Sequence, residues 1–165
     1  ALVGGLAVFW LTPSGLQQMP DITLTTLQGK KLALPKLQGR PVLVNFWSTT
    51  CTSCIKEMPH LVELYNELAP QGLEVIGIAM AYDPPNRVID FSKSRRIPYP
   101  VALDINSDAA KAFGDVRLTP TSFLIAPDGR VVHQKIGVLD VHKTRELVTA
   151  MLKQANLSPN QSKMN

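Results

Sequence analysis

The sequence contains two cysteines, Cys51 and Cys54, and together they form a single C-x-x-C motif. Two thiols at this spacing can form and break a disulfide, so the motif predicts thiol–disulfide exchange. It follows the apolar run Val42–Trp47 and opens a segment with the apolar period of a helix. A helix N-terminus carries unpaired N–H groups and positive partial charge, which stabilise a thiolate. We therefore expect Cys51 to attack disulfides, and Cys54, on the same helical face, to resolve the mixed disulfide.

Other uses of a cysteine pair are weaker alternatives. A structural disulfide that closes so short a loop restrains little chain entropy. A structural zinc site needs about four ligands, and the remaining candidates, His60, His133 and His142, fall on separate predicted elements. Binding of copper(I) by the two thiols, as in a metal carrier, remains an alternative from a different class of function. Redox exchange itself implies no metal or organic cofactor.

Strands are predicted where apolar residues run continuously or alternate. The continuous runs at 42–47 and 73–80 are typical of strands covered on both faces, as in a parallel or mixed sheet. A short strand is expected at 99–103, and hairpins at 22–34 and 121–135, each around a glycine-containing turn.

Four helices are predicted between and after these strands. The first covers about 52–69, the second ends before Arg96, the third is capped by Ser107 and runs through Phe113, and the last covers about 141–154. Asp140 is the expected cap of the last helix. The alternation predicts an α/β fold with a central mixed sheet and helices on both faces.

The composition fits one globular domain that would tolerate an oxidising compartment. Of 165 residues, 45% are hydrophobic and 18% are charged, and the net charge is +4. The basic residues are scattered and few aromatics lie among them, so nucleic-acid binding is not expected. Two cysteines in one motif leave no third thiol that could mispair in an oxidising compartment.

The ends of the chain differ from its middle. Residues 1–11 are uncharged and almost wholly apolar, but a helix of that length rises only about 16 Å against a hydrocarbon core of about 30 Å. We expect the remnant of a signal anchor, the alternative being an apolar arm packed on the domain. Residues 12–19 are expected to be a linker, 20–156 the domain, and 157–165 a flexible tail.

Two segments resemble the thioredoxin superfamily. VLVNFWSTTCTSCIKEMP (42–59) is similar to its active-site strand and helix, closest to the membrane-tethered TlpA/ResA-like branch, with Trp47 and Pro59 at the family positions. VRLTPTSFLIAPDGRVV (116–132) resembles the segment that carries the family cis-proline, here Pro120. The resemblance implies a thioredoxin fold with an N-terminal β-hairpin and a central insertion at roughly 83–104.

The resemblance also suggests residue roles around the cysteines. Asn45 stands where thioredoxins have a buried Asp, and Glu57, three residues after Cys54, matches a Glu of the TlpA/ResA-like branch. A helix returns Glu57 to the face of Cys54, so it could accept the Cys54 proton, the alternative being an ordinary solvated glutamate.

The loop at Pro120 completes the expected site. A cis Thr119-Pro120 bond would turn this loop toward the cysteines, where it could pair with an extended substrate. The alternative is a trans proline at the entry of a strand. Thr119 and Trp47 are expected to bind substrate.

The expected function is a thiol–disulfide oxidoreductase that exchanges disulfides with extracytoplasmic proteins, and the resemblance implies that it acts mainly as a reductant. The resemblance implies that a membrane thiol-electron donor recharges it. The protein is expected to be periplasmic or on another extracytoplasmic side, tethered to the inner membrane through its N-terminus or secreted. A dedicated reductant of apocytochrome c thiols ranks second, because those relatives usually carry Pro-Glu where this chain has Pro120-Thr121. A peroxidase that uses a single cysteine ranks third.

Overall fold

The structure is a computed structural model that describes residues 18–161, with side chains as far as Asn156. The predicted anchor (1–11), most of the predicted linker (12–17) and the last four residues lie outside this range. Among the described residues, no helix is long and apolar enough to cross a bilayer.

A five-stranded mixed sheet forms the centre of the fold, with the order β5-β4-β3-β6-β7. In its middle, β3 (Val42–Trp47) pairs parallel with β4 (Glu74–Ala79) and antiparallel with β6 (Thr121–Ile125). At the edges, β5 (Val101–Leu103) runs parallel to β4, and β7 (Val131–Ile136) runs antiparallel to β6. The sequence-based prediction of a mixed α/β sheet is confirmed.

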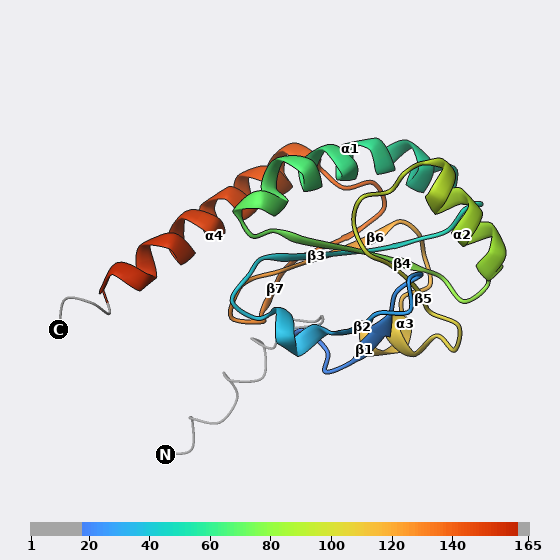
Figure 1. Ribbon diagram of the computed structural model, residues 1–165, viewed down its shortest axis with the longest axis horizontal. Coiled ribbons are helices and arrows are strands. Elements are labelled where there is room, and N and C mark those ends of the chain that lie inside the picture. Colours follow the sequence, from blue (N-terminus) through green and yellow to red (C-terminus); the bar gives the residue numbers. More distant parts are fainter. Residues whose placement is uncertain (1–17, 162–165) are drawn as a thin grey trace, which may run out of the picture.

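Helices cover both faces of this sheet (Figure 1). On one face lie α1 (Thr52–Leu68), α2 (Pro85–Ser94) and α4 (Val141–Gln161), with the short 3-10 helix η2 (Ala69–Gln71) after α1. The other face is covered by α3 (Asp108–Ala112), by the antiparallel hairpin of β1 (Thr23–Thr25) and β2 (Lys31–Ala33), and by the 3-10 helix η1 (Leu34–Leu37).

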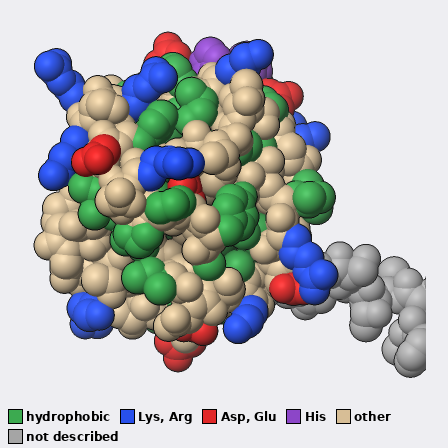
Figure 2. Space-filling view, turned by 90° about the vertical axis from the view of Figure 1, so that its right-hand side faces the viewer, with side chains coloured by type: hydrophobic (Ala, Val, Ile, Leu, Met, Phe, Trp, Pro, Cys, Tyr) green, Lys and Arg blue, Asp and Glu red, His purple; other side chains and the backbone are tan. Residues whose placement is uncertain are grey.

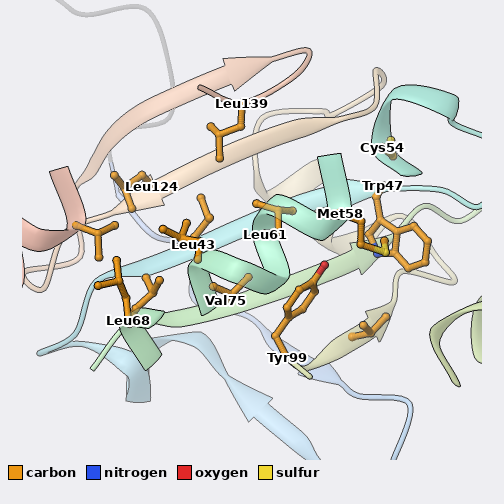
Figure 3. Close-up of a cluster of buried hydrophobic side chains, with 14 of the residues drawn as sticks. Leu43, Trp47, Cys54, Met58, Leu61, Leu68, Val75, Tyr99, Leu124 and Leu139 are labelled. Atoms are coloured by element: carbon orange, nitrogen blue, oxygen red, sulfur yellow. The ribbon is translucent and has the colours of Figure 1, made fainter. Parts of the chain in front are cut away.

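Strand β3 is buried along its whole length because both of its faces are covered. Leu43 and Trp47 point into the cluster under α1 (Figure 3), whereas Val44 and Phe46 point into the cluster over α3. Burying one such large apolar side chain contributes about 1.5–3 kcal/mol. Strand β3 therefore holds the start of the loop that follows it in a fixed position.

The segment expected as an insertion adds α2 and β5 between β4 and α3. One detail of the prediction is wrong here. Ser107 precedes α3 but has φ +60° and makes no side-chain cap. Asp104, at the end of β5, instead accepts the N–H groups of Ala109 at 2.9 Å and Ala110 at 2.8 Å. Its carboxylate satisfies two helix donors, where a serine hydroxyl would satisfy one.

The last helix begins as expected but ends later. The Asp140 carboxylate accepts the Lys143 N–H at 3.0 Å, which confirms the predicted cap. The helix continues to Gln161, beyond the predicted end at 154.

Candidate active site

The two cysteines lie where the central strand passes into α1. Trp47 ends β3, a three-residue loop follows, and Cys51 is the N-cap of α1. Cys51 and Cys54 are joined by a disulfide, with S–S 2.08 Å and Cα–Cα 5.2 Å. Cys51 is half-buried, whereas Cys54 is only 3% exposed. The outer sulfur is therefore the one that another molecule can reach.

The Cys51 sulfur also serves as the cap of its helix. Its Sγ accepts the Cys54 N–H at 3.2 Å, and the Ser53 hydroxyl lies 3.5 Å away. Donors at a helix N-terminus favour negative charge on the atom they face. A sulfur at such a position is suited to carry the negative charge of a thiolate when a disulfide is reduced.

The loop before Cys51 is held by Asp83, which the sequence analysis treated only as a boundary of the insertion. The Asp83 carboxylate accepts the Thr49 N–H at 2.5 Å and the Thr49 hydroxyl at 2.7 Å. Asp83 is buried and follows β4, so the clamp links two loops at the same edge of the sheet. Thr49 and Asp83 are 34 residues apart, so no local sequence pattern predicts their contact.

Glu57 is buried against the sheet, with 2% of its surface exposed. This excludes the alternative of an ordinary solvated helix glutamate. Its Oε1 accepts from Asn45 Nδ2 at 3.2 Å and its Oε2 from the Leu139 N–H at 2.9 Å. Burial raises the pKa of Glu57, while the Leu139 and Asn45 donors and the charge of His60 oppose the rise. Glu57 therefore holds its proton to a higher pH than an exposed glutamate does.

The loop at Pro120 lies at the same edge of the sheet. The Thr119-Pro120 bond is cis, as predicted, and Thr119 is half-buried. The Tyr82 hydroxyl lies 3.4 Å from the Thr119 hydroxyl. Both residues line an open depression of about 490 Å³ beside the dithiol, and the lining is mostly hydroxyl groups with one ammonium: Ser48, Thr50, Cys51, Thr52, Ser53, Lys56, Tyr82 and Thr119. The depression brings Cys51 and Thr119 together.

Trp47 lies elsewhere than expected for a substrate-binding residue. Its side chain is 1% exposed and packs on Phe91, with ring centroids 5.6 Å apart. In Figure 3 it lies beside Cys54 and Met58 in the buried cluster. The indole is thus a packing residue beneath the dithiol, because the covering helices leave it no surface for a substrate.

In the described part of the chain, no three His, Cys, Asp or Glu side chains converge as a group that could hold a metal ion. The sheet order, the helix that follows the central strand and the dithiol at its N-terminus together define a thioredoxin-fold protein with a redox-active disulfide.

Comparisons with known proteins agree with this class. The sequence profile of the AhpC/TSA family matches residues 16–134. The thiol-disulfide oxidoreductase ResA of Bacillus thuringiensis subsp. konkukian is 36% identical over 137 residues, which are 83% of this chain and 76% of the relative. ResA of Bacillus subtilis is 35% identical over 120 residues, 73% of this chain and 66% of the relative.

A solved structure agrees at the level of the fold. The thiol:disulfide interchange protein of Chlorobium tepidum TLS superposes with a TM-score of 0.75 at 27% identity, covering 86% of this chain and 99% of that one. The chain therefore belongs to the AhpC/TSA family of the thioredoxin superfamily, and it is a ResA-like thiol–disulfide oxidoreductase.

Proposed function

We propose that Cys51 is the attacking sulfur of this oxidoreductase and Cys54 the resolving one. The Cys51 thiolate attacks a substrate disulfide, forms a mixed disulfide and releases one substrate thiolate. The Cys54 thiolate then attacks the Cys51 sulfur, releases the second substrate thiolate and leaves the Cys51–Cys54 disulfide. Two electrons thus pass to the substrate. The difference in exposure between the two cysteines, Cys51 half-buried and Cys54 only 3% exposed, carries this assignment.

Serine variants test the two roles separately. Cys51→Ser is expected to abolish dithiothreitol-driven reduction of insulin, because no attacking sulfur remains. Cys54→Ser is expected to accumulate a mixed disulfide between Cys51 and the substrate, visible on a non-reducing gel, because resolution is blocked. Equal trapping by both variants would contradict the assignment.

The same proposal gives Glu57 the role of proton acceptor for Cys54. Resolution requires a buried thiol to lose its proton, and burial disfavours the thiolate. Glu57 lies one helical turn after Cys54 and is itself buried, and its raised pKa makes it a stronger base than an exposed glutamate.

Glu57→Gln keeps the size and an acceptor oxygen but removes the base. We expect it to slow the decay of a mixed disulfide on Cys51, followed by stopped-flow between pH 6 and 9. General-base assistance is worth about 10²- to 10⁴-fold, so a tenfold loss is a cautious expectation. The first attack by Cys51 serves as the internal control and is expected to change little. Equal decay rates for both proteins would remove Glu57 from the mechanism.

We further propose that the substrates are extracytoplasmic proteins and that the protein acts mainly as a reductant. Pro120 and Thr119 would present the loop on which an extended substrate lies beside Cys51. A membrane thiol-electron donor would recharge the dithiol, with residues 1–11 as the tether.

The direction of electron flow is open to measurement. A reduction potential near the thioredoxin value of about −270 mV supports a reductant, and one near the DsbA value of about −120 mV contradicts it.

A further inference from the structure

Asn45 and Ser122 form a polar pair inside an otherwise apolar layer. They are direct cross-strand partners in β3 and β6, and 3% and 1% of their surfaces are exposed. Leu43 and Leu124, the next pair of partners on the same face, are apolar and belong to the core cluster under α1. Polar side chains buried at such a place cost stability unless their hydrogen bonds are made.

Their hydrogen bonds lead to Glu57. Asn45 Nδ2 donates to Ser122 Oγ at 3.0 Å and to Glu57 Oε1 at 3.2 Å, which commits both protons of the amide. The Leu139 N–H donates to the other carboxylate oxygen, Glu57 Oε2, at 2.9 Å. The Glu57 carboxylate is thus held from β3 on one side and from the loop before α4 on the other.

The hydrogen bond to Ser122 determines the orientation of the Asn45 side-chain amide. Ser122 Oγ accepts a hydrogen bond from one N–H of the Asn45 amide. The planar geometry of the amide then directs its other N–H toward Glu57 Oε1. Without that acceptor the amide could rotate about its last bond and present its oxygen, which would repel a carboxylate. Ser122 therefore acts on Glu57 through Asn45.

We propose that Asn45 and Ser122 are positioning residues that hold the Glu57 carboxylate in place and favour its deprotonated form for the resolution step. This inference rests on the proposed role of Glu57 as proton acceptor. It concerns two residues that lie outside the dithiol, the Pro120 loop and the depression beside them.

The other titratable groups near Glu57 are few. Cys54 and the exposed His60 lie on α1 itself, and the buried Tyr99 lies just before β5. The pKa of Tyr99 is raised by burial and by Glu57. Asp140, next to Leu139, is exposed and caps α4. Strands β3 and β6 carry no titratable side chain, so from the sheet only the Asn45 amide acts on the carboxylate.

The test compares Asn45→Ala and Ser122→Ala with Ser122→Thr, which keeps the hydroxyl. The readout is the pH dependence of mixed-disulfide resolution on Cys51, measured by stopped-flow. Removing a hydrogen bond to a charged carboxylate is expected to move the pH midpoint upward by about 1 unit for Asn45→Ala and by less for Ser122→Ala. Ser122→Thr is expected to restore the wild-type midpoint. Purely structural damage would lower the rate without moving this midpoint.

The same substitutions in a Glu57→Gln background separate the two proposals. There, Asn45→Ala and Ser122→Ala are expected to have no further effect on the midpoint, because the group they position is gone. If Glu57→Gln slows resolution but neither alanine variant moves the midpoint, the positioning role is overturned and the role of Glu57 stands. If Glu57→Gln does not slow the resolution step, then both the proton-acceptor role of Glu57 and the positioning role of Asn45 and Ser122 are overturned.

Discussion

At the level of single residues, Cys51 differs from Cys54 in what surrounds its sulfur. The Cys51 sulfur accepts a backbone N–H at the N-terminus of α1, whereas Cys54 is buried in the cluster under that helix. We therefore expect the reduced protein to have a Cys51 thiol pKa below the ordinary value of about 8.5. Iodoacetamide is expected to modify Cys51 well before Cys54 below pH 8, as mass spectrometry of the peptides will show. A pKa at or above the ordinary value would contradict the effect of the helix N-terminus.

Contacts between residues one helical turn apart could be predicted from the sequence. Cys51 and Cys54 are three residues apart at the start of α1, and so are Cys54 and Glu57, so the spacing alone predicts that each of these pairs is close. Ser122 could not be found in this way, because its contact with Asn45 joins positions 77 residues apart. That contact depends on the register of β3 against β6, which no local pattern encodes.

At the level of elements, the loop before the dithiol depends on the loop after β4. Asp83 is buried and accepts both the backbone and the hydroxyl donor of Thr49, in two partly buried hydrogen bonds. Asp83→Ala is expected to lower the free energy of unfolding by about 2 kcal/mol, because it leaves two donors without a partner. Thr49→Val removes only the hydroxyl bond and is expected to cost about 1 kcal/mol. Urea denaturation of the oxidised proteins measures both, and equal losses would mean that the backbone bond contributes nothing.

The order of strands and helices was predictable because it follows from hydrophobic periods and turn residues. The continuous run at 42–47 predicted a strand covered on both faces, and β3 is buried throughout. Details that depend on neighbouring elements were not predictable. Asp104 caps α3 in place of Ser107 because the end of β5 brings its carboxylate to the helix. The path of the chain, more than its local composition, determines which side chain serves as a cap.

At the scale of the whole molecule, exposed apolar side chains gather at the edge of the sheet that carries the dithiol. Five of the six large exposed apolar side chains among the described residues follow or precede strand ends at this edge: Tyr82, Ile105, Leu118, Ile136 and Val138. Figure 2 faces this edge and shows hydrophobic side chains in several patches among charged side chains, other side chains and backbone. Apolar side chains at this edge, outside the hydroxyl-lined depression at Cys51, are consistent with the proposed protein substrate, which would contact more of this edge than a small disulfide does.

The sixth residue, Val132, provides a matched control for this surface. It is 42% exposed near the start of β7, at the opposite edge, while Leu118 is 63% exposed just before Thr119. Leu118→Ser is expected to raise KM for insulin about 3- to 10-fold, because a half-covered leucine contributes about 0.7–1.4 kcal/mol to docking. Val132→Ser is expected to leave that KM unchanged. The rate with the small disulfide DTNB is expected to stay the same in both variants, since the dithiol is untouched. If Leu118→Ser slows insulin and DTNB equally, or if Val132→Ser matches it, the apolar edge has no part in docking the protein substrate.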